Sequence, residues 1–441
     1  MYPVSRVANS KRKLARRRRS SRAAAALVAA AATATTTALV SVPAQAAQAV
    51  TLTFLNTGAS PQVIKYFDST VIPAFEKANP GVTVQMSTVD WGASFTKIET
   101  GAVAGTADDV FLMGNIMLPV LASKHGLYPL TKFVTGWRVA KQLNQPALHA
   151  GVWDNVQYAV PVNLDVRGLI YNKAMLQKAG IAKPPTDWAQ YEADGAKLVQ
   201  KSGSRIKVEG VDWAIDNSVG LSQTFNLLIT EAGGSLFHNG KGGSATFTGD
   251  SVAGAQALNY LVSFYKKGIS STSFIDVGSA PTPVALGEAA MEMNNAGSFS
   301  EASPAVTKDL VMTAPLSSSA GGRPVGQEFV NKLGIYSKTK HPQQAWAFIK
   351  YLYTPSILSK WDQLLGEAPP LPSLANRAPW NSGVYHAMVE DEQYAKVFPV
   401  ELQSTTIDED LTRVVEDVVY QKTSVPAALS EMKSMITPLL K

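Results

Sequence analysis

The 441-residue sequence contains no cysteine. This absence excludes disulfide bonds, thiolate metal ligands and cysteine nucleophiles. Long uncharged apolar runs are also missing beyond the N-terminal region, so no later segment is expected to span a membrane.

Recognisable catalytic motifs are missing as well. The five histidines form no HExxH or other close metal-ligand pair, and the sequence has no GxSxG elbow, no P-loop and no GxGxxG after a strand. Asp108 and Asp109 are adjacent, so in a strand their side chains would point to opposite faces and could not act as a paired acid and base. We therefore expect no enzyme activity, no metal site and no cofactor.

The N-terminal region is strongly basic and then apolar. Its first 22 residues contain nine Lys or Arg and no acidic residue, and an Ala/Thr/Val-rich stretch follows from Ala23 to about Val42. Ala44–Ala46 and Ala47–Ala49 then form small-x-small patterns that signal peptidase recognises. A membrane anchor is a weaker interpretation, because alanine and threonine are only weakly hydrophobic. Residues 1–49 are thus predicted to be a secretory signal peptide, for either the general secretory or the twin-arginine route.

Removal of this segment changes the charge balance. Lys plus Arg would fall from 40 to 31 while Asp plus Glu stays at 34, so the formal net charge would move from +6 to −3. The basic character therefore belongs to the targeting segment, and nucleic-acid binding is not expected. Without a cysteine to carry a lipid, the protein should be exported and soluble, in the periplasm or outside the cell.

Strand and helix patterns alternate along the rest of the chain. Predicted elements at the start are the strands 50–56, 82–89 and 109–113 and the helices 62–79 and 95–104. Later in the chain, strands are predicted at 169–172, 290–293, 310–312 and 332–336. Helices are predicted to end near 179, 201, 232, 267 and 353, and a further helix to 420 is predicted to be opened by the acidic residues 408–410. A β-α-β-α-β start predicts an α/β fold with a mainly parallel sheet.

Aromatic and amide side chains near strand ends are the main chemical feature. Aromatic faces cover the apolar C–H side of a sugar ring, and carboxylates and amides satisfy its hydroxyls. Trp91, Trp213 and Trp380 lie in loops beside polar residues and are candidates to line a cleft. Trp346 and Trp361 lie in apolar helix patterns and are expected in the core.

At this point the sequence resembles the extracellular solute-binding proteins of ABC sugar importers, of the maltodextrin-binding type. The order and spacing of the motifs carry the resemblance more than any single motif does. The matching segments are FEKANPGV at 75–82, 107–110, GLYPL at 126–130, YAVPVNLDVRGLIYNK at 158–173, 179–188, EAGGSLF at 231–237, GEAAM at 287–291 and 338–348.

The resemblance implies a two-lobed periplasmic-binding-protein fold of class II, with the ligand between lobes that close by hinge bending. Hinge crossings are expected near 160–164, 313–325 and 366–373. Lobe one would comprise residues 50–160 plus 316–366, and lobe two residues 161–315 plus 367–441. The implied partners are a carbohydrate and the permease subunits of an importer, with the binding protein itself a monomer.

The resemblance also indicates where ligand contacts should lie. Asp165 occupies the position of a sugar-binding carboxylate, whereas Gln223 stands near a position where a stacking ring is common, and Phe299 could replace a family tryptophan. This loss of stacking area favours a short or more polar sugar. The predicted ligand-binding residues are Asn56, Thr57, Trp91, Met113, Asn115, Asp165, Trp213, Gln223, Asn295, Phe299, Glu328 and Trp380.

Three alternatives stay open. The same fold could bind a glycerophosphodiester, a polyamine or a peptide; a phosphate would favour Arg167 and Arg323, and a polyamine would need several carboxylates, of which we expect few in the cleft. A secreted carbohydrate-active enzyme would require two carboxylates across a bond, for which Asp165 and Glu328 are the candidates. A sensor accessory would report the bound ligand to a membrane kinase, and it would use the same closed form as a transport protein does.

Overall fold

The computed structural model describes residues 49–440 except 214, 216–219, 240–244 and 275–280. The predicted signal peptide therefore lies outside the described residues, apart from its last position. Within the described ranges, none of the helices combines the length and apolarity needed to cross a bilayer.

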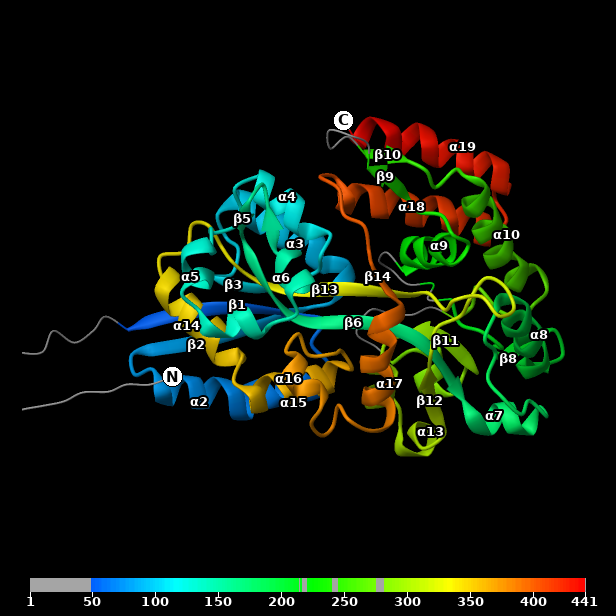
Figure 1. Ribbon diagram of the computed structural model, residues 1–441, viewed down its shortest axis with the longest axis horizontal. Helices are drawn as coiled ribbons and strands as arrows, with labels where there is room; N and C mark the ends of the chain where they lie inside the picture. Colours follow the sequence, from blue (N-terminus) through cyan, green and yellow to red (C-terminus); the bar gives the residue numbers. More distant parts are fainter. Residues whose placement is uncertain (1–48, 214, 216–219, 240–244, 275–280, 441) are drawn as a thin grey trace, which may run out of the picture. The chain divides into compact units, whose positions relative to one another are not determined.

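A mixed sheet forms the centre of the fold. Its main path has the order β11-β6-β13-β3-β1-β2, with β12 also paired to β6 and β14 to β13 (Figure 1). The strands are β1 (Val50–Thr57), β2 (Val82–Val89), β3 (Val110–Met113), β6 (Ala159–Asn172), β11 (Met291–Asn294), β12 (Leu310–Thr313), β13 (Gly326–Ile335) and β14 (Ala395–Val397).

Two long antiparallel strands connect the two ends of this sheet. β13 pairs with β6 from Gln327 opposite Arg167 to Gly334 opposite Ala159, and β13 also pairs with β3. The distal end of β6 instead pairs with β11 and β12. β6 thus runs without interruption from the β1–β3 part of the sheet to the β11–β12 part (Figure 1).

Helices cover both faces of the sheet. The α-helices up to β6 are α1 (Pro61–Tyr66), α2 (Ile72–Ala78), α3 (Trp91–Ala104), α4 (Met117–Ser123), α5 (Thr131–Thr135) and α6 (Gln145–His149). Those that follow are α7 (Lys173–Lys178), α8 (Trp188–Leu198), α9 (Gly220–Glu231), α10 (Val252–Lys266), α11 (Pro283–Leu286), α12 (Gly297–Glu301), α13 (Pro304–Thr307), α14 (Pro342–Leu352), α15 (Pro355–Leu365), α16 (Pro372–Ala375), α17 (Gly383–Asp391), α18 (Ser404–Val419) and α19 (Val425–Ile436).

Short elements complete the described chain. The π-helix η1 (Phe67–Val71) joins α1 to α2, and the 3₁₀ helices are η2 (Arg138–Gln142), η3 (Glu392–Tyr394) and η4 (Thr437–Leu440). The ribbons pair β4 (Val152–Trp153) with β5 (Val156–Gln157), β7 (Gln200–Ser202) with β8 (Arg205–Val208), and β9 (Phe237–Asn239) with β10 (Ala245–Phe247).

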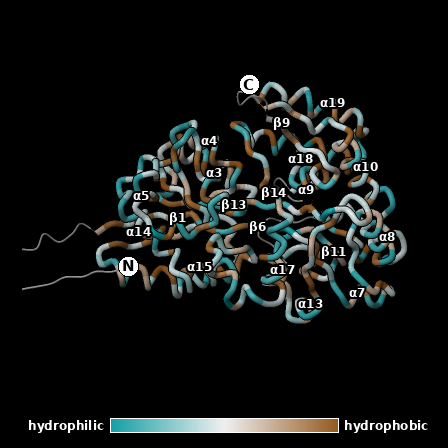
Figure 2. The backbone as a smooth tube through the Cα atoms, viewed as in Figure 1, coloured by the Kyte–Doolittle hydropathy of each residue, from teal (hydrophilic) through white to brown (hydrophobic). Residues whose placement is uncertain are grey.

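Side chains alternate between two hydrophobic cores. In β3, Val110 and Leu112 belong to the core that includes α1, α2, α14 and α15, whereas Phe111 and Met113 belong to the core that includes α3, α4, α9, α10, α18 and α19. A strand buried on both faces reads as a continuous apolar run for this reason. Figure 2 shows polar and apolar residues alternating along the helices, as expected where one helix face covers a sheet.

Several sequence expectations need correction. The sheet is mixed rather than mainly parallel: β1 is parallel to β2 and β3, but β6 and β13 are antiparallel to their main-path neighbours. The strand expected at 169–172 is the end of the 14-residue β6. The acids 408–410 do not open α18, which starts at Ser404; Asp408 is buried and accepts a hydrogen bond from Ser222.

Candidate functional site

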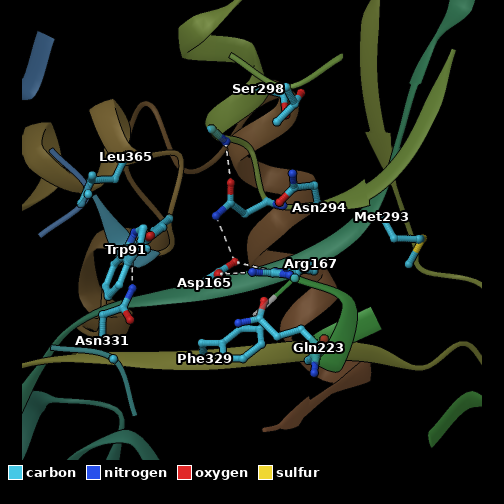
Figure 3. A pocket seen from close by; sticks show the side chains of 18 of the residues that line it. Trp91, Asp165, Arg167, Gln223, Met293, Asn294, Ser298, Phe329, Asn331 and Leu365 are labelled. Carbon is cyan, nitrogen blue, oxygen red and sulfur yellow. Dashed lines mark hydrogen bonds and ion pairs between the residues drawn. The ribbon is translucent and has the colours of Figure 1, made fainter. Parts of the chain in front are cut away.

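A cavity of about 210 Å³ lies where the loops after β1 and β3 approach β6, β13, α9 and β11. β1 and β3 are parallel neighbours, so the loops that follow them meet at the same edge of the sheet. These loops contribute Gly58, Ser60, Gly114 and Asn115 to the lining. Figure 3 shows side chains from separate elements converging on the cavity.

An ion pair lies in the middle of this cavity. Arg167 Nη2 donates to Asp165 Oδ2 at 3.1 Å, and Asn295 Nδ2 donates to Asp165 Oδ1 at 3.0 Å. The two charged residues are two positions apart in β6, so both side chains leave the same face of the strand. The guanidinium lies 4.6 Å from the centre of the Phe329 ring, on the adjacent strand β13 (Figure 3). The Asp165 carboxylate is therefore held in a fixed position facing the cavity.

Trp91 forms one aromatic wall. It is the first residue of α3, directly after the N-cap Asp90, whose side chain accepts from the Ala93 N–H at 2.9 Å. The indole lies against Gly58, which has a φ of +68°, and a Cβ at that position would collide with the ring. Only glycine combines that backbone conformation with so close an approach. The local sequence therefore places an indole face at the cavity edge.

Trp213 also contributes to the lining. It packs edge-on against Tyr191, Tyr260 and Phe264, with ring centres 5.0–6.1 Å apart. Its side chain is almost fully buried, and its Nε1 has no hydrogen-bond partner in the described part of the chain. A buried N–H without a partner is energetically unfavourable.

Carboxylates are more numerous in the lining than the sequence led us to expect. Five line the cavity, against a single cation, Arg167, among the described lining residues; they are Asp165, Asp212, Glu292, Glu301 and Glu367. Burial, with a further contribution from Asp165, raises the pKa of Glu367 to about 8. The expectation that the cleft holds few carboxylates is wrong.

Half of the predicted ligand-binding residues reach the cavity. Trp91, Asn115, Asp165, Trp213, Gln223 and Asn295 line it. Asn115 also donates to the Phe398 carbonyl at 3.1 Å, which ties its loop to the segment after β14. Gln223 belongs to α9 and extends into the cavity (Figure 3).

Three predicted residues at strand ends point into the protein instead. Asn56, Thr57 and Met113 are fully buried and do not line the cavity. The Thr57 hydroxyl donates to the Leu112 carbonyl at 2.7 Å, so it bridges β1 and β3. The ligand-facing positions of these loops are one or two residues further on, at Gly58 and Gly114.

Phe299, Glu328 and Trp380 are also outside the lining. Phe299 packs against a hydrophobic core. Trp380 is completely buried and its Nε1 donates to Ser359 Oγ at 2.8 Å. Glu328 is buried on β13, where desolvation and the charges of Glu392 and Asp165 raise its pKa to about 7. Strand alternation explains its place, because its neighbours Gln327 and Phe329 line the cavity and Glu328 does not.

The same alternation identifies Phe329 and Asn331, which the sequence reasoning missed. Gln327, Phe329 and Asn331 all line the cavity from β13, at every second position. On the neighbouring strand β6, Arg167 lies opposite Gln327 and Asp165 lies opposite Phe329, and both also line the cavity. Period-2 alternation along GQEFVN places all three on one face, but the strand would have had to be expected from Gly326 rather than from 332.

The described residues contain no group of three or more His, Cys, Asp or Glu that could hold a metal ion. The placement of Glu328 also removes the proposed enzymatic pair, since of Asp165 and Glu328 only Asp165 lines the cavity. Hydrolysis of a glycosidic bond needs two carboxyl groups flanking it.

Comparisons with known proteins agree with this architecture. The structure is similar to an ABC transporter solute-binding protein from Thermotoga lettingae bound with α-D-tagatose, with a TM-score of 0.80, 21% identity, and coverage of 89% of this chain and 100% of that one. It is also similar to the maltose-bound T. maritima MalE3, with a TM-score of 0.78, 20% identity, and coverage of 89% and 100%. The fold is thus the two-lobed periplasmic-binding-protein fold that the resemblance implied.

A shorter match links the sequence to curated relatives. A putative binding protein of Brucella abortus is 31% identical over 138 residues, which is 31% of this chain and 33% of that protein. This chain therefore aligns with about a third of the length of such relatives. The profile of the bacterial extracellular solute-binding protein family matches residues 58–357. The chain belongs to this family, whose members are binding proteins, and the resemblance noted in the sequence is confirmed.

Proposed function

We propose that this protein captures a mono- or short oligosaccharide outside the cytoplasmic membrane and delivers it to the permease of an ABC importer. One observation carries the proposal: the cavity combines two indole side chains, Trp91 and Trp213, with a surrounding set of carboxylates and amides. Rings of a sugar stack on aromatic faces, while its hydroxyls need buried hydrogen-bond partners. Tagatose and maltose bound to the two similar proteins support the same ligand class.

Capture would proceed by hinge closure between two lobes, 50–160 plus 316–366 and 161–315 plus 367–441. The cavity receives Trp91 and Asn115 from the first proposed lobe and Gln223, Asn295 and Trp213 from the second. A ligand that contacts both sets favours the closed state by the difference in its affinity for the two states. The permease would recognise this closed state, and the protein would act as a monomer.

The proposed site of action is the periplasm or the extracellular space, after cleavage of the predicted signal peptide 1–49. The protein would bind its ligand without converting it. Incubation with the tightest ligand, followed by mass spectrometry of the solution, should return that ligand unchanged. A reaction product would contradict this part of the proposal.

A thermal-shift screen tests the ligand class. Sugars, glycerophosphocholine, spermidine and short peptides would be added separately at the same concentration. A ligand that binds only the folded state stabilises it by RT ln(1 + [ligand]/Kd), so the Tm rises with the logarithm of the ligand concentration relative to Kd. We expect a rise with at least one sugar. A rise only with a non-sugar would overturn carbohydrate capture.

A further inference from the structure

Glu367 is held in a fixed position at the cavity wall. Its N–H donates to the Asp362 carbonyl at 3.0 Å at the end of α15, and the next residue, Ala368, exchanges two backbone hydrogen bonds of 2.8 Å with Leu164 of β6. Glu367 itself is 6% exposed and lines the cavity. Backbone bonds on both sides therefore determine where this carboxyl group meets a ligand.

Few donors stabilise this carboxyl group. Within the described ranges, Glu367 accepts a single side-chain hydrogen bond, from Asn331 Nδ2 to Oε2 at 3.1 Å. The neighbouring Asp362 is fully buried, and neither of its carboxyl oxygens has a partner in the same ranges. Buried carboxylates need several donors or a paired cation to stay ionised. One donor for two neighbouring carboxyl groups is too few to keep both ionised.

The charges around Glu367 favour its protonated form. Burial and then the charge of Asp165 raise its pKa to about 8, although the Asn331 hydrogen bond and Arg167 act in the opposite direction. Arg167 is itself paired with Asp165 at 3.1 Å, so it compensates that carboxylate first. Burial and the charge of Glu367 raise the pKa of Asp362 as well. Glu367 is therefore mostly protonated at neutral pH.

Other ionisable side chains in this region do not offset that preference. Arg167 is the single cation among the described lining residues, and Glu292 of β11 and Glu301 of α12 are acids. Lys332 on β13 is buried and interacts with Glu328. An ionised Glu367 would thus gain little from its surroundings.

We propose that Glu367 keeps its proton and donates it in a hydrogen bond to an oxygen of the captured sugar, so that capture weakens when this proton is lost. The proposal rests on the proposed carbohydrate function and assigns one contact within it. A protonated carboxyl group donates one O–H, whereas a carboxylate only accepts. A bound sugar also removes water from Glu367, and this desolvation penalises the ionised form further.

Calorimetry between pH 6 and 9 tests the proposal with the sugar that gives the largest thermal shift among glucose, galactose, mannose, xylose, tagatose, maltose and cellobiose. If only the protonated form binds, affinity should be about tenfold weaker at pH 9 than at pH 6, because a group with a pKa of about 8 is then about nine-tenths ionised. Binding at pH 9 should also take up about one proton per sugar, measured in two buffers of different ionisation enthalpy. Constant affinity across this range, or no proton uptake at pH 9, would overturn the proposal.

Variants identify the group that titrates. In Glu367→Gln the amide keeps an acceptor for Asn331 and a donor for the sugar but has no proton to lose, so its affinity should change by less than about twofold between pH 6 and 9. Glu231→Gln, at a buried acid of similar pKa outside the lining, and Asp68→Asn, at an exposed acid in η1, should each retain the wild-type dependence. A decrease in Glu367→Gln equal to that of the wild type would overturn the proposal.

Asn331→Ala provides a second test if circular dichroism shows that Glu367→Gln does not fold. The Asn331 hydrogen bond lowers the pKa of Glu367, so without it affinity should begin to fall at a higher pH. An unchanged midpoint in folded Asn331→Ala would contradict the proposal.

The outcomes separate this proposal from the proposed function. Sugar binding that does not depend on pH would overturn the role of Glu367 and leave carbohydrate capture intact. No thermal shift with any of these sugars at pH 6 would overturn both.

Discussion

Trp91 and Trp380 illustrate how residues of one type acquire different roles. Both lie in polar stretches of the sequence, but Trp91 rests on Gly58 at the cavity, whereas Trp380 is enclosed against Tyr385 and donates to Ser359. Composition around a residue does not determine its burial, because burial depends on elements far away in the sequence.

Substitution of these two tryptophans should separate binding from stability. Trp91→Ala should weaken binding of the best sugar by about fivefold, since it removes one stacking surface worth about 1 kcal/mol. Trp380→Ala should instead lower the free energy of unfolding by about 3–5 kcal/mol, the cost of truncating a buried aromatic side chain. Calorimetry measures the first and urea denaturation the second. Equal effects of both variants on affinity would contradict these assignments.

Glu231 should make stability depend on pH. It is buried at the end of α9, accepts from Trp188 Nε1 at 2.5 Å, and has a pKa raised by burial to about 8. Its pKa in the unfolded chain lies near 4.5. Because the folded state holds the proton more tightly, the contribution of Glu231 is complete below about pH 4.5 and is lost as the pH rises through about 8.

Replacing the Glu231 carboxyl group should make the free energy of unfolding depend less on pH. Between pH 5 and 8, the decrease in the free energy of unfolding should be at least about 2 kcal/mol smaller in Glu231→Gln than in the wild type, given about 1.4 kcal/mol per pKa unit. Denaturation curves across this range, with Asp68→Asn as the control, measure the difference. Parallel profiles for wild type and Glu231→Gln would show that burial does not raise this pKa.

At the scale of elements, local patterns located many of the strands and helices but not their extents. VTVQMSTV gave the bounds of β2, and the apolar spacing after residue 62 predicted helix where α1, η1 and α2 follow one another. The lengths of β6 and β13 were underestimated, since Pro161 and the polar residues 163, 165 and 167 resemble a loop. Asp165 and Arg167 are tolerated because they pair with each other in the cavity, whereas the buried Asn163 amide has no hydrogen-bond partner in the described ranges.

This underestimate explains why Glu328 was a candidate for ligand binding while Phe329 and Asn331 were not. Once β13 is known to run through residues 326–335, period-2 alternation assigns Gln327 and Phe329 to the cavity and Glu328 to the other face. The carboxylates Asp212 and Glu292 could not have been joined from sequence, because the bridge between them links segments 80 residues apart. Long-range pairing, rather than local propensity, decided these positions.

The end of α15 provides a test at the same scale. Gly366 caps this helix with a φ of +70°, and a Cβ there would collide with the backbone of Gly297, which opens α12 beside the cavity. Gly383 has a similar φ of +61° but open space around it. Gly366→Ala should therefore destabilise the protein by at least about 1 kcal/mol more than Gly383→Ala, because overpacking adds to the shared backbone strain. Chemical denaturation of both variants measures this, and equal losses would contradict the close packing.

At the scale of the whole molecule, the fold class was predictable because it depends on repeated patterns and on motif order over most of the chain. The match to the solute-binding family over residues 58–357 and the TM-score of 0.80 to a tagatose-bound protein confirm that prediction. The described cavity lining combines one paired arginine, two indoles and five carboxylates.

The central claim is that this cavity captures a carbohydrate, and a calorimetric titration with the sugar that gives the largest thermal shift tests it most directly. The account predicts saturable binding of one sugar per protein molecule, weakened by Trp91→Ala. Absence of binding heat with every sugar, together with one-to-one binding of a non-sugar solute, would contradict it.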